Sequence, residues 1–139
     1  MNPSLLVRYL IILSTILCVG CGDKGSKNES ATIPPLTDSI VNEAYNFFVT
    51  GDYHNYVLQM QSVSGKPDEY VRGMEILYKQ HAAELRDNYE GIKSFKVNRL
   101  RTKEGDASAT AFLEVTYGNG TEEEIMLTFI YDSGHWKLR

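Results

Sequence analysis

The sequence predicts an α+β domain in which N-terminal helices pack on a curved antiparallel sheet. Two observations support this prediction. Between residues 37 and 90, apolar residues recur every three or four positions, which is the period of a helix with one buried face. After Gly91 the period changes to two, as in strands that bury one face. Helices followed by consecutive strands are typical of helices lying on one face of an antiparallel sheet.

Three helical segments are expected before Gly91. The first runs from residue 37 to residue 50, with a capping residue among Thr37 to Ser39 and a stop at Gly51. Asp52 is expected to cap a second, shorter segment, and Pro67 to begin the third and longest one. The expected apolar stripes are, in chain order, Ile40, Ala44, Phe47 and Phe48; Tyr53, Tyr56, Val57 and Met60; and Tyr70, Met74, Leu77, His81 and Leu85.

The remaining chain is expected to form strands joined by tight turns. Asn119 and Gly120 both tolerate positive φ, so they predict a type I′ turn between two strands. Ser133 and Gly134 predict a second tight turn. Apolar and polar residues alternate over the expected strands, which cover residues 95–97, 109–117, 125–131 and 136–138.

The N-terminal segment reads as a secretory signal. Arg8 and the amino terminus supply positive charge, and the apolar run from Leu10 to Val19 follows. This run is about half as long as the roughly 20 residues that span a bilayer. Val19-Gly20-Cys21 resembles the lipobox of bacterial lipoproteins, in which the signal is removed before a cysteine that receives a diacylglycerol. Cys18 departs from this pattern, because leucine is commonest at its position.

The resemblance to lipoproteins implies a domain organisation and a location. Residues 1–20 would be the signal, Cys21 the lipidated residue, residues 21–35 a flexible tether and residues 36–139 the folded domain. The protein would then be anchored by lipid in the bacterial cell envelope; whether at the inner or the outer membrane stays open. The alternative is an ordinary secretory signal that leaves Cys21 free. With Cys21 lipidated and Cys18 removed, no thiol would remain for disulfides, catalysis or metal binding.

Charge argues against a nucleic-acid partner. The chain has a formal net charge of −4, and its lysines and arginines are scattered along the sequence. Proteins that bind a phosphate backbone gather such residues into a basic patch or stripe. The expected macromolecular contacts are therefore the membrane, through the lipid, and other proteins.

Several short segments resemble one family when taken in order. They are Gly51-Asp52-Tyr53, the stretch from Gly91 to Val97, the stretch from Val115 to Gly120, and Gly134-His135-Trp136-Lys137. Together they resemble the DUF4878 family of small bacterial lipoproteins, in the nuclear transport factor 2-like, or cystatin-like, superfamily of α+β cones. The resemblance implies a long helix across a strongly bent sheet, with a cavity at the wide end. It carries over no catalytic residue, and relatives on this fold include isomerases, hydrolases and binding domains.

The expected lining of such a cavity is Tyr56, Tyr78 and His81. Tyr117 and Tyr131 could face it from the sheet. Acid–base enzymes on this cone use a carboxylate whose pKa is raised by a dry pocket, often with a tyrosine as donor. Asp52 is better explained as a helix cap than as such an acid. No catalytic residue is therefore predicted.

No cofactor or metal is predicted either. The three histidines, His54, His81 and His135, lie far apart and have no ligand at a recognised spacing. Consecutive strand residues point to opposite faces, so the acidic run from Glu122 to Glu124 cannot converge on one cation.

Three functions remain as hypotheses. The preferred one is a non-catalytic binding domain that captures a small apolar ligand or a protein segment. The second is an interaction module, homodimeric or not, that pairs through the outer sheet face around Phe112, Met126 and Ile130. The third is an isomerase or hydrolase, which would require a buried acid near Tyr78 or His81.

Overall fold

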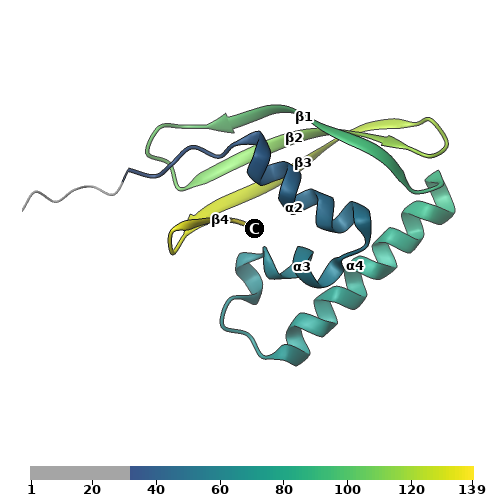
Figure 1. Ribbon diagram of the computed structural model, residues 1–139, viewed down its shortest axis with the longest axis horizontal. Helices are drawn as coiled ribbons and strands as arrows, with labels where there is room; N and C mark the ends of the chain where they lie inside the picture. Colours follow the sequence, from purple (N-terminus) through teal and green to yellow (C-terminus); the bar gives the residue numbers. More distant parts are fainter. Residues whose placement is uncertain (1–31) are drawn as a thin grey trace, which may run out of the picture. The chain divides into compact units, whose positions relative to one another are not determined.

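The computed structural model describes residues 32–139. The expected signal, Cys21 and the tether up to residue 31 lie outside these residues. The elements follow the predicted order, and the α+β class is confirmed (Figure 1). They are α2 (Asp38–Thr50), α3 (Tyr53–Leu58), the short 3₁₀ helix η1 (Gln61–Val63), α4 (Asp68–Tyr89), β1 (Ile92–Thr102), β2 (Ser108–Tyr117), β3 (Glu122–Asp132) and β4 (His135–Leu138). Within residues 32–139, no helix combines the length and the apolar character needed to cross a bilayer.

The sheet is an antiparallel meander in the order β1-β2-β3-β4. In Figure 1, α2 lies against one face of this sheet, whereas α4 meets the sheet only at its C-terminal end and extends away from it past α3. Side chains alternate between the two faces, and register shifts in β1 between Ile92 and Ser94 and between Val97 and Arg99 keep the apolar residues in phase. The inner face of β2 is the alternating set Ala109, Ala111, Leu113, Val115 and Tyr117, all of them buried.

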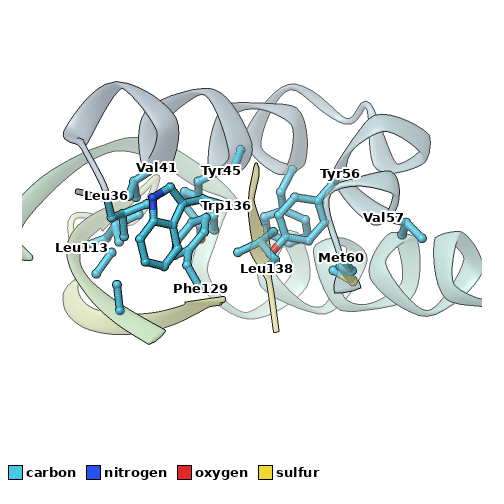
Figure 2. Packing of buried hydrophobic residues seen from close by; sticks show 14 of the residues in the cluster. Leu36, Val41, Tyr45, Tyr56, Val57, Met60, Leu113, Phe129, Trp136 and Leu138 are labelled. Atoms are coloured by element: carbon cyan, nitrogen blue, oxygen red, sulfur yellow. The ribbon is translucent and has the colours of Figure 1, made fainter. Parts of the chain in front are cut away.

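The core forms between this inner face and the helices. Figure 2 shows Val41 and Tyr45 of α2 near Leu113 and Phe129 of the sheet, whereas Tyr56 of α3 lies further along the same cluster, toward Leu138. All the buried apolar residues of this cluster lie between Leu36 and Leu138, and residues 31–139 form one compact unit. A chain of residues 32–139 therefore contains the complete cluster and should fold by itself.

The capping residues of the first two helices are as predicted. The Thr37 side chain accepts a hydrogen bond from the Ile40 amide, and Gly51 ends α2 in the left-handed conformation. The Asp52 side chain accepts a hydrogen bond from the Asn55 amide at 3.2 Å, which caps α3.

The buried face of α2 differs from the predicted one. Val41 and Tyr45 are buried together with Ala44 and Phe48, whereas Ile40 and Phe47 are half-buried. The observed and predicted stripes overlap, because a helix advances by about 100° per residue and its buried stripe is about that wide. The orientation of α2 against the sheet selects between them.

The α4 stripe is displaced in the same way. The residues that reach the core cluster are Val71, Met74, Tyr78, Ala82 and Leu85. Of the predicted stripe, Tyr70 is 41% exposed and Leu77 is 57% exposed. Both stripes contain the residues at positions 74 and 85, so periodicity alone could not separate them. The packing of α4 against α3 selects the observed one.

The prediction of a type I′ turn at Asn119-Gly120 is wrong. Only Gly120 has a positive φ, of 85°, and the Tyr117 amide donates to the Thr121 carbonyl at 2.9 Å. This is a three-residue loop that ends in a left-handed glycine, the next commonest hairpin class. The turn between β3 and β4 is the one with positive φ at both central residues, 52° at Ser133 and 86° at Gly134.

The β2–β3 loop docks on the C-terminal end of α4. The Gly118 amide donates to the Gly91 carbonyl at 2.8 Å, and the Asn119 amide donates to the Tyr89 carbonyl at 3.0 Å. Glu90 ends the helix in the left-handed conformation, with φ of 62°. These contacts hold the long helix against the far end of the sheet.

Residues at the start of the described chain also join the domain. The indole N–H of Trp136 donates to the Pro34 carbonyl at 3.0 Å, and Ile33 packs against the core. Among the described residues, Ile33 and Pro34 thus contact the domain although both precede Leu36, where the folded domain was expected to start.

Candidate functional site

A cavity of about 440 Å³ lies between α4 and the inner face of β2 and β3. Side chains from α2, α3, α4 and both strands line it, and five of the nine tyrosines of the chain are among them. The aromatic rings in the lining are those of Tyr45, Phe48, Tyr56, Tyr78, His81, Tyr89 and Tyr117.

The structure brings the three predicted lining residues together. The ring centroids of Tyr56 and Tyr78 lie 5.0 Å apart with their planes at 81°. Phe48 connects them to His81, because its centroid lies 5.2 Å from that of Tyr56 and 5.8 Å from that of His81. Such edge-to-face and stacked pairs are favourable aromatic geometries. Residues from three helices therefore converge on one recess.

Of the other residues considered from the sequence, one lines the cavity and two lie elsewhere. Tyr117 lines the cavity, as considered, and its ring stacks on Tyr89 with centroids 4.8 Å apart. Tyr131 lies elsewhere, because it packs edge-to-face on Trp136 at 5.4 Å and is absent from the cavity lining. Asp52 is a cap and does not line this cavity.

Sequence reasoning missed Tyr45, Tyr89 and Glu123. Glu123 is the clearest case, because its carboxylate accepts a hydrogen bond of 2.7 Å from the Tyr117 hydroxyl inside the recess. Strand alternation could have placed Glu123 in the cavity, because it precedes Ile125 by two positions and therefore faces the same side of β3. Its neighbours Glu122 and Glu124 lie on the outer face, where Glu124 pairs with Arg99 at 3.4 Å, so Glu123 points away from both of them, as the alternation along a strand predicts.

Four of the tyrosine hydroxyls that line the cavity stay protonated well beyond neutral pH. Burial raises the pKa of Tyr45 and of Tyr56 well above the usual range, and burial also raises the pKa of Tyr78. Burial, followed by the hydrogen bond to the Glu123 carboxylate, raises the pKa of Tyr117 to about 12. At physiological pH these groups are therefore neutral hydrogen-bond donors.

The charged groups of the lining are carboxylates. Glu84 and Glu123 contribute side chains, and none of the described residues that line the cavity is a lysine or an arginine. His81 lies at the rim, with Nδ1 3.9 Å from a carboxylate oxygen of Glu84. Within residues 32–139, no charged residue is buried, and no three His, Cys, Asp or Glu side chains come close enough to hold a metal ion.

The outer sheet face is more polar than the sequence predicted. Phe112 is only 5% exposed, because the guanidinium of Arg99 lies 4.0 Å from its ring centroid and that of Arg101 lies 5.3 Å away. Ile130 is half-buried, whereas Met126 is 67% exposed. Of the three apolar residues expected there, Met126 alone offers a large exposed surface.

Comparisons with known proteins support the fold. No protein-family model matches the sequence, and no curated protein does. Among solved structures, the chain is similar to a Campylobacter jejuni protein named "Putative NTF2-like transpeptidase", with a TM-score of 0.56 and 13% sequence identity. The similarity covers 72% of this chain and 94% of the other. At this identity the likeness concerns the fold, which is NTF2-like.

Proposed function

We propose that this protein is a lipid-anchored binding domain of the bacterial cell envelope that holds a small, largely apolar ligand without transforming it. The observation that carries this proposal is the cavity of about 440 Å³ with its aromatic lining. Ligand sites in proteins are concave and mostly apolar or aromatic, with a few polar groups that fix orientation. The protonated tyrosine hydroxyls would supply those polar groups.

Two features favour binding over catalysis. Proton transfer on this type of cone depends on a carboxylate in a dry pocket, whereas Glu84 and Glu123 are both exposed. Transpeptidation, the activity in the name of the Campylobacter jejuni protein, proceeds through acyl transfer to a nucleophile such as serine or cysteine. The described residues that line the cavity include neither. We therefore do not extend that activity to this chain.

Binding can be tested with the neutral fluorescent dye Nile red and the chain of residues 32–139. We expect its fluorescence to rise on binding, and Tyr78→Ala to weaken that rise, because Tyr78 lines the cavity. Tyr70→Ala is the matched control, since Tyr70 lies on the same helix and is 41% exposed outside the cavity. Equal binding by wild type and Tyr78→Ala, or no binding by wild type, would contradict the proposal.

The anchor is proposed to be a diacylglycerol on Cys21, as in the DUF4878 family that the sequence resembles. A single acyl chain gives marginal membrane binding, whereas two or more anchor stably. Cells that express the full chain would be fed an alkyne analogue of palmitate. We expect the label in wild type and in the control Cys18→Ser, and its loss in Cys21→Ser. A labelled Cys21→Ser protein would show that the anchor lies elsewhere.

A second candidate is self-association through the outer sheet face, favoured by the exposure of Met126. Its neighbourhood is largely polar, which makes it a small apolar patch by the standards of protein interfaces. Size-exclusion chromatography with light scattering would detect a dimer, and Met126→Lys should dissociate it. A monomer at high concentration would exclude this candidate.

A further inference from the structure

The cavity has three chemical features that act together on a ligand. Aromatic rings enter it from several directions, carboxylates provide its negative charge, and aliphatic side chains cover part of its wall. The rings and the carboxylates discriminate between head groups of different charge, whereas the aliphatic wall accommodates an apolar tail.

Aromatic rings of the lining stand at steep angles to one another. The planes of Tyr56 and Tyr78 meet at 81°, and those of Phe48 and Tyr78 at 79°. The face of an aromatic ring carries negative electrostatic potential and attracts a cation, above all a quaternary ammonium group held by several rings. Phenol and phenyl rings set at steep angles around one recess are therefore suited to a cationic head group.

The charges of the lining point to the same ligand class. Glu123 and Glu84 carry the negative charge, and no lysine or arginine of the described chain lines the recess. Glu123 already accepts one hydrogen bond from Tyr117, but a carboxylate has two oxygens and accepts several. An anionic ligand would meet two carboxylates without a cationic partner, which selects against it.

The remaining wall suits an apolar tail. Leu85 of α4 and Ile125 and Leu127 of β3 line the recess, and all three pack against the core. Burial of methylene groups on such a wall contributes affinity irrespective of the head group.

We infer that the cavity binds an amphiphile whose head is an amine or a quaternary ammonium group and whose tail is apolar. This inference rests on the proposed binding function and specifies its ligand class.

The test compares three probes with the same alkyl chain and different heads, measured by calorimetry on residues 32–139 below their micelle concentrations. The probes are decyltrimethylammonium, decanol and decanoate. We expect decyltrimethylammonium to bind at least about tenfold more tightly than decanol, and decanoate to bind most weakly. Decanol reports the proposed binding function, because it has the same apolar tail and a head group without charge.

Substitutions identify the side chains that would give the preference for the ammonium head group. Glu123→Gln keeps the shape and an acceptor for Tyr117 but removes the charge, so it should weaken decyltrimethylammonium binding severalfold and leave decanol unchanged. Glu122→Gln is the matched control, because Glu122 precedes it in β3 and lies on the outer face. Tyr78→Phe should keep the preference for the ammonium head, whereas Tyr78→Leu should reduce it. Thermal melting would first establish that each variant is folded.

The outcomes separate the two proposals. Equal affinities for decanol and decyltrimethylammonium, or a preference unchanged in Glu123→Gln and Tyr78→Leu, would overturn the cationic head and leave the binding function intact. Failure of all three probes to bind would overturn both.

Discussion

The contact between Gly118 and the end of α4 allows a sharp prediction for the substitution Gly118→Ala. A Cβ atom at this position would lie 2.8 Å from the Glu90 Cβ and closer still to the Glu90 carbonyl oxygen. Gly118 has no positive φ. The cost of the substitution is therefore purely steric and does not arise from backbone conformation.

The expected loss of stability follows from the contacts that the Gly118→Ala substitution would break. To relieve the clash, the β2–β3 loop has to withdraw from α4, which breaks the Gly118–Gly91 bond of 2.8 Å and the Asn119–Tyr89 bond of 3.0 Å. Each contributes about 1 kcal/mol net, and overpacking adds about 1 kcal/mol or more. We expect the free energy of unfolding to fall by about 3 kcal/mol. In a domain of this size that corresponds to a melting temperature lower by about 12 °C or more.

Urea denaturation and thermal melting, both followed by circular dichroism, would measure the change. The control is Gly73→Ala in α4, where no heavy atom lies within 4 Å of the added Cβ. That substitution should stabilise the protein by about 0.5 to 1 kcal/mol, because alanine favours a helix. If Gly118→Ala changed stability by less than about 0.5 kcal/mol, the size of an ordinary surface substitution, the close packing of loop and helix would be refuted.

Three further predictions concern other parts of the fold. Trp136→Phe removes the 3.0 Å hydrogen bond to the Pro34 carbonyl and should lower the free energy of unfolding by about 1 to 2 kcal/mol. Hydrogen–deuterium exchange followed by mass spectrometry should then show faster exchange of the backbone amides that precede α2, and unchanged exchange at these amides would contradict the prediction. Phe112→Ala should destabilise the protein by about 3 kcal/mol, because the Phe112 ring is buried under two guanidinium groups. Met126→Ala should change stability in chemical denaturation by less than about 0.5 kcal/mol, and equal effects of the two substitutions would be inconsistent with their different burial. The pKa values of Tyr45, Tyr56, Tyr78 and Tyr117 are raised, that of Tyr117 to about 12, so folding favours the protonated form of these four hydroxyls. Their contribution to stability is complete below the unfolded pKa of about 10 and is lost as the pH rises through the folded pKa values. Tyrosinate absorbance should accordingly show a late-titrating class that merges with the main class on unfolding, and a single class in the folded protein would argue against it.

Much of the secondary structure could be predicted from local patterns. The change of period at Gly91, the caps at Thr37 and Asp52 and the stop at Gly51 each depend on residues within about four positions of one another. The alternation along β3 likewise predicted that neighbouring glutamates diverge. Such features are encoded locally because capping and pleating involve neighbouring residues only.

The turn at Gly118 to Gly120 shows the limit of local reasoning. Asn119-Gly120 has the composition of a type I′ turn, yet the loop has three residues and its backbone amides bind the end of α4. The partner carbonyls lie about thirty positions earlier in the chain, at Tyr89 and Gly91. Turn propensity carries no information about such a partner.

The sequence by itself determined the order of the elements, their caps, and the alternation that divides each strand into an inner and an outer face. The tertiary structure alone decided which stripe of α2 and α4 is buried, and that Tyr45, Tyr89 and Glu123 share one recess with Tyr56 and Tyr78. The physical reason is the range of the interactions. Hydrogen bonds and propensities within a few residues set the local elements, whereas the rotation of a helix about its axis depends on its packing against distant surfaces, where adjacent stripes compete with nearly equal apolar content.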